Sequence, residues 1–252
     1  RTEDTNYFAS MTDLLVGFLF VFVIMLAYFA FQMQQQNEKY SELDKYISSA
    51  QEARDNLVRN VVKELNENNV EAKIGRSNNV ITISGESLFR SASSIVDSEF
   101  GADKKLDEIS RVLLNHLKCH AFKNGKPPAS MVLQSCNPSR MFVEAVFVEG
   151  HTDNVPIKGV LADGSRTNLE LSAHRATNSY QRMVQTYEEL TTLKNPSGEQ
   201  ALSVAAYGEQ RPVQTNATSS GRADNRRIDI LIDMHAPKSV RELQNLLNLI
   251  NE

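Results

Sequence analysis

Residues 142–154 read FVEAVFVEGHTDN, and this stretch decides the fold of the C-terminal part of the chain. Its first nine residues, Phe142–Gly150, are rich in aromatic and β-branched side chains, which is the composition of a β-strand. The polar run His151–Asn154 follows at once. We therefore predict a strand that ends where side chains with charge and hydrogen-bonding capacity begin.

Further strands and helices are predicted on both sides of this strand. Strands are indicated at Asn79–Ser84 (NVITIS), Ala201–Tyr207 (ALSVAAY) and Arg227–Asp233 (RIDILID). Helical periodicity covers residues 104–117, KKLDEISRVLLNHL, and residues 171–190. The order β-α-β-α-β-(α)-β predicts an α+β sandwich in which helices cover one sheet.

A membrane helix is predicted near the N-terminus. Residues Leu14–Phe31, LLVGFLFVFVIMLAYFAF, contain no charge and no proline. At ~1.5 Å per residue this run crosses most of a ~30 Å hydrocarbon core, and it is apolar on all faces, unlike an amphipathic core helix. The preceding segment is acidic and no small-residue cleavage site follows, so we expect an uncleaved span over residues 8–32. Because the first residue is Arg1, we expect the natural N-terminus to lie upstream, and loop charges cannot set the orientation.

Asp13 is the one acid inside this expected span. A carboxylate in hydrocarbon costs about 2.5 kcal/mol or more, and such residues usually face a bundle interior or a wet path. A carboxyl group that loses its water becomes easier to protonate. Two interpretations stay open: Asp13 binds a proton on an ion path, or it only marks the start of the helix at the headgroup boundary.

Residues 33–70 are polar and helix-prone, with neither proline nor glycine, and predict a stalk. Apolar residues recur at three- and four-residue steps, interrupted by Arg54, at Leu43, Ile47, Ala50, Leu57 and Val61. This stripe is compatible with pairing to a second copy of the chain. A solvated spacer helix is the alternative.

Cys119 and Cys136 are the two cysteines, and they bracket a loop-like stretch, HAFKNGKPPASMVLQS. In an oxidising compartment this pair would form a disulfide that closes the loop and stabilises the fold by roughly 3 kcal/mol. Two unrelated buried thiols are the alternative.

Several functional classes are disfavoured. The formal net charge of −4 over 252 residues does not suggest nucleic-acid binding. His151 has no second histidine at ligand spacing and the other four histidines are scattered, so no metal site is predicted. No glycosidase carboxylate pair or serine triad is apparent. We expect a binding protein, not an enzyme, and no cofactor.

Four separated motifs carry a family resemblance. They are VEGHTDN at Val148–Asn154, NLELSAHRA at Asn168–Ala176, YGEQRPVQTN at Tyr207–Asn216 and GRADNRRIDI at Gly221–Ile230. In this order they resemble the OmpA-like peptidoglycan-binding family, over residues 75–235. The segment SLFRSAS, residues 87–93, falls in the expected entry loop after the first strand.

The resemblance implies binding of the peptide stem of peptidoglycan. Carried over by position, Asp153 would take the ammonium and Arg175 the carboxylate of a diaminopimelate side chain. Arginine offers a planar donor fork and an aspartate offers only acceptors, which suits this division. A structural ion pair between Asp153 and Arg175 is the alternative. Arg227 is expected to support the fold, and the further pocket residues that the resemblance implies are Thr152, Asn168, Leu171, Asn225 and Arg226.

Two segments depart from the family pattern. Residues 154–167, NVPIKGVLADGSRT, are longer than the family's short form and are expected to reshape or cover the pocket. The cysteine-bracketed stretch, residues 118–140, is an additional insertion.

The combination of an acid-bearing helix, a stalk and an OmpA-like domain resembles the B subunits of flagellar stators, the MotB type. More narrowly, it resembles the B subunits of the Zorya anti-phage defence systems (ZorB). This implies a proton-driven motor in the bacterial inner membrane, with a cytoplasmic N-terminus and a periplasmic C-terminal domain. The implied partners are membrane lipids, peptidoglycan, a second copy of the chain and a ring of A-type, MotA- or ZorA-like subunits.

Three alternatives accompany this assignment. They are a flagellar MotB-type stator subunit, a passive wall tether without ion conduction, and a transport subunit of the TolR or ExbD kind, a class that lacks these wall-binding motifs. The predicted boundaries are a cytoplasmic tail over 1–7, the membrane helix over 8–32, the stalk over 33–70, the OmpA-like domain over 71–236 and an amphipathic C-terminal helix within 237–252.

Overall fold

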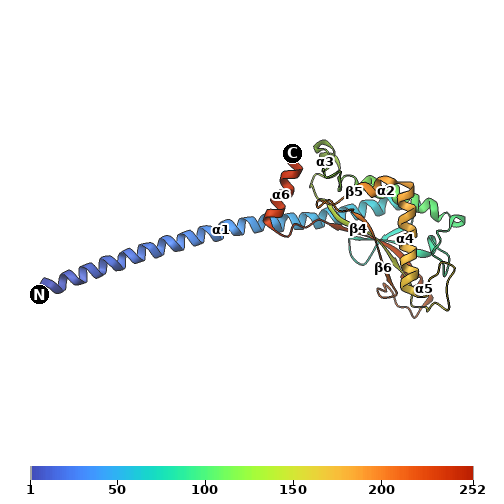
Figure 1. The fold of residues 1–252 in the computed structure, drawn as a ribbon, viewed down its shortest axis with the longest axis horizontal. Coiled ribbons are helices and arrows are strands. Elements are labelled where there is room, and N and C mark those ends of the chain that lie inside the picture. The colour runs from blue at the N-terminus through green and yellow to red at the C-terminus, as the bar shows by residue number, and fades with distance from the viewer. Residues whose placement is uncertain (1, 252) are drawn as a thin grey trace. The chain divides into compact units, whose positions relative to one another are not determined.

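The computed structural model describes residues 2–251, with side chains described for all of them except residues 2–10, 100 and 251. The chain divides into two compact units, Arg1–Tyr46 and Ile47–Glu252. Helix α1 (Thr2–Glu67) begins in the first unit and ends in the second (Figure 1). The segment predicted as a tail, residues 1–7, is therefore helical from Thr2 onward, and Arg1 lies outside the described residues.

The first unit consists of helix α1 alone. Every side chain from Met11 to Glu42 is exposed, including the whole Phe-rich run. Within the described residues, α1 is the one helix that is long and apolar enough to cross a membrane. Exposure of this much apolar surface to water is unfavourable. Contact with lipid tails or with the apolar faces of other membrane helices removes this cost.

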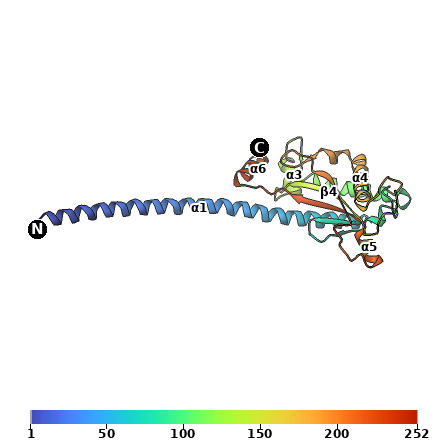
Figure 2. The same cartoon turned by 60° about the horizontal axis from the view of Figure 1, so that its bottom comes forward.

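The second unit is built on a five-stranded sheet in the order β1-β2-β7-β4-β6. Strand β4 of this sheet is labelled in Figure 2. All neighbouring strands are antiparallel except β4 and β6, which are parallel. The strands are β1 (Ala72–Ile74), β2 (Val80–Ser84), β4 (Val143–His151), β6 (Leu202–Gly208) and β7 (Arg227–Met234). Four of them lie where the sequence predicts strands; β1 was not predicted, because three residues are too short to show a pattern.

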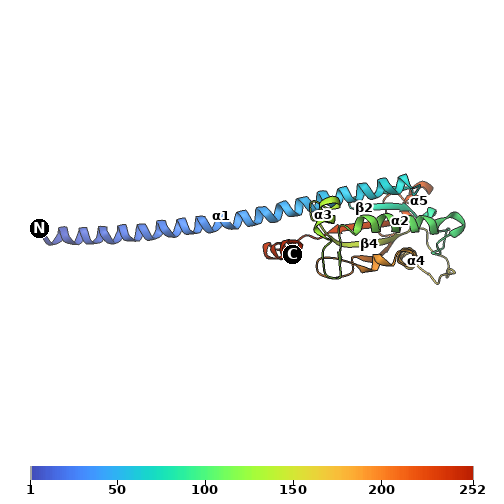
Figure 3. The same ribbon diagram turned by 90° about the horizontal axis from the view of Figure 1, so that it is seen from above.

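Helices cover one face of this sheet, and they can be followed in Figure 3. Helix α4 (Asn168–Thr186) packs on β4 and β6, and α2 (Ala102–Leu117) lies beside α4. Arg182 of α4 binds Asp107 of α2 at 2.8 Å. Because side chains alternate along a strand, β4 directs Val146, Val148 and Gly150 toward the helices and Glu149 and His151 toward the open face.

The end of helix α1 belongs to the domain core, which corrects the prediction of a free stalk. Leu57 is 3% exposed, and Val61 and Leu65 are fully buried. Glu64 accepts from Arg111 of α2 at 3.0 Å and lies 2.9 Å from His116 Nε2. Pairing of this part of the stripe with a second copy and the solvated spacer are therefore both wrong, because the chain's own domain covers it.

Capping chemistry sets the start of α4 three residues before the predicted one. Thr167 accepts from the Glu170 N–H at 3.2 Å, and the Glu170 carboxylate accepts from the Thr167 N–H at 3.1 Å, which is a capping box. After Thr186 the chain continues as a 3₁₀ turn, η3 (Glu188–Thr192). The remaining elements are η1 (Gly85–Ser87), η2 (Ser98–Phe100), α5 (Ser219–Asn225), α6 (Val240–Asn251) and the two-stranded pair β3 (Phe122–Lys123) and β5 (Leu193–Lys194).

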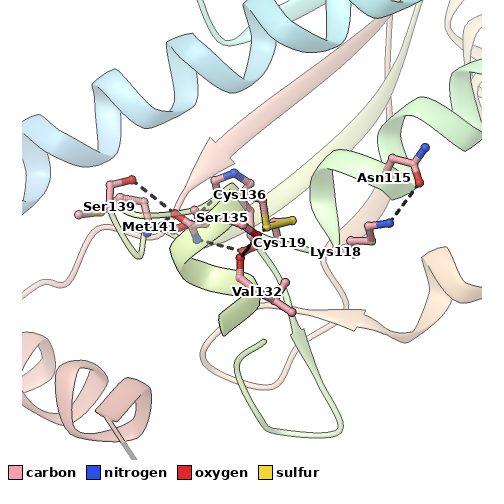
Figure 4. Close-up of a disulfide and its surroundings, with 10 residues drawn as sticks. Asn115, Lys118, Cys119, Val132, Ser135, Cys136, Ser139 and Met141 are labelled. Carbon is pink, nitrogen blue, oxygen red and sulfur yellow. Dashed lines mark hydrogen bonds between the residues drawn. A yellow bond between two sulfur atoms is a disulfide. The ribbon is translucent and has the colours of Figure 1, made fainter. Parts of the chain in front are cut away.

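The two cysteines form a disulfide that joins the segment after α2 to the end of α3 (Ser130–Cys136) (Figure 4). The bracketed stretch contains both α3 and β3, so it is more ordered than the expected loop. Asn137 completes the junction, since its amide donates to the carbonyls of Cys119 at 3.0 Å and of Met141 at 2.8 Å.

Candidate functional site

A pocket of about 550 Å³ opens where strand β4 ends. Its walls come from the residues after β4, the loop 154–167, the first half of α4, residues 85–92, and α5 with the residue that follows it. Six of the seven predicted wall-binding residues line it, namely Thr152, Asp153, Asn168, Leu171, Arg175 and Arg226. They come from three separate motifs, which the fold brings together.

Gly150 allows β4 and α4 to approach closely at this pocket. A Cβ added at Gly150 would lie 2.0 Å from the backbone oxygen of Ser172, so no other residue fits without moving the helix. Ser172 also accepts from the N–H of Gly208 through its Oγ, at 2.9 Å. The contact fixes α4 against the sheet, so that Arg175 and Asp153 face one pocket.

The carboxylate of Asp153 accepts hydrogen bonds from other residues of the same chain. It is 8% exposed, and Oδ1 accepts from the N–H of Val155 at 3.0 Å. Oδ2 accepts from Arg226, whose other terminal nitrogen donates to Glu86. Among the described residues Asp153 makes no ion pair with Arg175, so that structural alternative is wrong. Each carboxylate oxygen keeps a second lone pair for a ligand donor.

Arg175 is 3% exposed and is oriented by the entry segment SLFRSAS. Its Nε donates to the carbonyl of Ser93 at 2.8 Å, Nη2 lies 3.3 Å from the carbonyl of Arg90, and the guanidinium centre lies 5.3 Å from the centroid of Phe89. Burial and the neighbouring Arg226 lower the pKa of Arg175 to about 10, which leaves it charged at neutral pH. A buried cation with a remaining donor suits a carboxylate ligand.

The other predicted residues differ in what they can offer. Thr152 is 4% exposed, and its Oγ1 is buried without a hydrogen-bond partner among the described residues. Asn168 donates to the carbonyl of Val155 at 3.1 Å and to Glu209 at 2.6 Å, and Leu171 supplies an apolar wall.

Asn225 lies outside the pocket lining, in contrast to its predicted role in ligand binding. Its Oδ1 accepts from the N–H groups of Val213 and Gln214 at 2.7 and 3.0 Å, and its amide donates to the carbonyl of Gln214. The hydrogen bonds of its side chain therefore order the turn that precedes α5. Arg227 supports the fold as expected, with Nε donating to Asp229 at 2.8 Å.

Several pocket residues were not named from the sequence. Glu86 comes from η1, Arg90 from the entry segment and Arg222 from α5. The longer loop 154–167 contributes Val155, Pro156, Ile157, Lys158 and Leu161 to the pocket lining. The sequence signal that pointed to these pocket residues was the length of the loop, which exceeds that of the family pattern.

Asp13, the predicted proton-binding acid, lies in the first unit. Its side chain is exposed, at the start of the apolar run of α1. The pocket at the end of β4 belongs entirely to the second unit, so the two predicted sites are in different units.

A buried cluster of ionisable residues on the open face of the sheet was also not predicted from the sequence. Glu149 and Asp229 are register partners on β4 and β7, and His151 Nε2 lies 3.8 Å from the first carboxylate and 3.3 Å from the second. The ligand atoms of the three residues lie within 4.8 Å of one another, a separation that a metal ion could bridge. Protein donors already serve both carboxylates, however: Tyr207 donates to Glu149, and Thr82 and Arg227 donate to Asp229.

Comparison with known proteins agrees with this fold. Residues 133–226 match the OmpA family. Motility protein B of Bacillus subtilis (strain 168) is 35% identical over 88 residues, which is 34% of this chain and 29% of that protein. The match thus covers less than a third of the relative's own length.

Solved structures with a similar domain include a cell wall anchor and a MotB-like protein. The cell wall anchor of the T6SS from Pseudomonas aeruginosa has a TM-score of 0.46 at 24% identity, over 72% of this chain and 99% of that chain. A MotB-like protein from Desulfovibrio vulgaris has a TM-score of 0.49 at 19% identity, over 76% of this chain and 94% of that chain. The predicted fold class is confirmed: a long apolar N-terminal helix is followed by an OmpA-like α+β domain with a mixed sheet.

Proposed function

We propose that this chain is a MotB-like, B-type stator subunit of an inner-membrane ion motor and that its C-terminal domain binds the peptide stem of peptidoglycan. The observation that carries wall binding is the pocket at the end of β4, where Asp153 and the buried Arg175 face the same space. The similarity of residues 133–226 to the OmpA family and of 88 residues to motility protein B supports the same assignment.

The ligand chemistry follows from the two charged groups. The free end of diaminopimelate carries an ammonium and a carboxylate on one carbon. Arg175 supplies a fixed donor for the carboxylate, and Asp153 supplies acceptors for the ammonium, which it must share with Arg226. Thr152 Oγ1, which lacks a partner within the described residues, completes the polar lining.

Wall binding is tested by retention of the full-length, detergent-solubilised protein on purified peptidoglycan. Charge reversal at Arg175 is a poor variant, because a glutamate would face the carbonyls of Ser93 and Arg90 and would destabilise the loop. We expect Arg175→Gln to abolish retention and Arg175→Lys to retain a part of it, with unchanged circular dichroism. Full retention by folded Arg175→Gln would overturn the assignment of this pocket.

The motor part of the proposal rests on Asp13. Protons would enter from the periplasmic side, neutralise Asp13 and leave to the cytoplasm, and each charge that crosses supplies about 2.3 kcal/mol per 100 mV. Alternating charge on two Asp13 copies would change their contacts with a surrounding ring of A-type subunits. The wall-bound domains would provide the fixed point against which torque acts.

Proton flux tests this role directly. Liposomes that contain this chain and its A-type partner are expected to lose flux with Asp13→Asn and to keep part of it with Asp13→Glu. If Asp13→Asn retains both flux and biological activity, the chain is a passive wall tether, which is the second candidate function.

Within the stator class we propose the Zorya anti-phage type, with the flagellar MotB type as the alternative. The Phe-rich helix that continues as one helix to Glu67 and the disulfide-closed insertion motivate this choice. A deletion strain separates the two: loss of phage protection with normal swimming supports defence, and loss of swimming supports the flagellar type.

A further inference from the structure

The wall pocket carries an excess of positive charge. Five basic side chains and two acidic side chains line it. The acids are Glu86 and Asp153, and both are bound by Arg226. A ligand with a single carboxylate and a single ammonium would leave this excess in place, so the lining suits a ligand with more than one carboxylate.

Four of the five basic groups have partners inside the protein. Arg226 is paired with two acids, and Arg90 is paired with Asp97 and Glu99. Arg175 donates to loop carbonyls, and Arg222 donates to the carbonyl of Asn216 at 2.8 Å. Lys158 is the exception: it is exposed and makes no hydrogen bond or ion pair with any described residue.

The loop that carries Lys158 is anchored on both sides of it. On one side the N–H of Val155 donates to Asp153 at 3.0 Å, and the carbonyl of Val155 accepts from Asn168 at 3.1 Å. On the other side the N–H of Leu161 donates to the carbonyl of Ser165 at 2.9 Å. Pro156 fixes one backbone dihedral between these anchors. Lys158 is therefore presented at the pocket from a held segment.

We propose that Lys158 binds a second carboxylate of the peptide ligand, distinct from the carboxylate that Arg175 takes. This inference rests on the proposed function, since a peptide stem carries carboxylates besides the zwitterionic end of diaminopimelate. It makes the pocket selective for stems whose other carboxyl groups are free over stems in which they are amidated.

Binding of two synthetic peptides to the full-length, detergent-solubilised protein tests this. The first is L-Ala-γ-D-Glu-meso-diaminopimelate with all carboxyl groups free. In the second, the D-Glu carboxyl and the main-chain carboxyl of diaminopimelate are amidated, so the side-chain zwitterion keeps the one free carboxylate. An exposed ion pair predicts about two- to fivefold tighter binding of the first peptide.

Lys158→Gln is expected to bind both peptides with the affinity that the wild type shows for the amidated one. Lys104→Gln, an equal change of charge on an exposed residue of α2 outside the pocket, is expected to keep the wild-type preference. Equal binding of the two peptides by the wild type, or an unchanged preference in Lys158→Gln, would overturn the role of Lys158. Failure of the wild type to bind either peptide would instead overturn the wall-binding function itself.

Discussion

Asp153 is paired with Arg226, which lies between α5 and β7, and the buried Arg175 instead donates to the backbone of the segment after β2. The two residues that the family resemblance places on one ligand are thus held by different parts of the protein. Each is fixed before a ligand arrives, which lowers the entropic cost of binding.

This arrangement predicts a specific energetic coupling. A double-mutant cycle of Asp153→Asn with Arg226→Gln should give an interaction free energy of about 1–3 kcal/mol in urea unfolding, because the pair is largely desolvated. The matched cycle of Asp153→Asn with Arg175→Gln should give a clearly smaller value. Equal couplings in the two cycles would mean that Asp153 divides its charge between both arginines.

Gly150→Ala should disturb the pocket by displacing helix α4 from strand β4. The new methyl would meet the backbone oxygen of Ser172, which cannot turn away as a side chain can. We expect a loss of about 1–3 kcal/mol in unfolding free energy, together with weaker retention on peptidoglycan, because α4 carries Arg175. Ala145→Ser, on the same strand, serves as the control and should change stability by less than about 0.5 kcal/mol. Wild-type retention by Gly150→Ala would show that the pocket tolerates movement of α4.

Leu65→Ala should destabilise the C-terminal domain, although Leu65 lies in the predicted stalk. The side chain is fully buried, and truncation of such a leucine costs about 2–5 kcal/mol. Lys63→Ala, two residues earlier and exposed, should cost less than about 0.5 kcal/mol. Chemical unfolding monitored by circular dichroism compares the two variants. A cost for Leu65→Ala no larger than that of Lys63→Ala would place this part of α1 outside the cooperative unit.

Reduction of the Cys119–Cys136 disulfide should lower the unfolding free energy by ~3 kcal/mol, since it closes a short loop in the unfolded chain. For a domain of this size that corresponds to a fall of roughly 6–12 °C in Tm. Differential scanning calorimetry with and without dithiothreitol measures it. The double variant Cys119→Ser/Cys136→Ser should show the low Tm under both conditions, which separates the disulfide from other effects of the reductant.

Acid should weaken the buried charged group of the open face. Burial by itself would raise the pKa of Asp229, but His151, Arg227 and Thr82 together lower it below the usual value of 3.8. A depressed carboxyl pKa adds stability above the unfolded value, about 3.9, and this stability is lost as pH falls through the folded pKa.

The difference in unfolding free energy between the wild type and Asp229→Asn should therefore be constant from pH 7 to about pH 5 and shrink below about pH 4. Urea titrations at pH 7, 5, 4 and 3 provide the comparison. A difference that stays constant down to pH 3 would show that folding does not lower the pKa of Asp229.

The sequence by itself determined the local elements and the residue types of the site. The apolar run of Leu14–Phe31, the strand that ends at the HTD motif and the helix predicted over residues 171–190 all follow from composition and spacing. These features depend on neighbours within a few residues, which is the range over which periodicity and capping act.

Tertiary structure decided which of these residues meet. Asp153 is paired with Arg226, and Arg175 donates to a loop carbonyl. The apolar stripe around Val61 became domain core, because an amphipathic helix shows that a face must be buried but not what buries it. Glu149 and Asp229 met through strand register across 80 residues of chain, a pairing that no local pattern encodes.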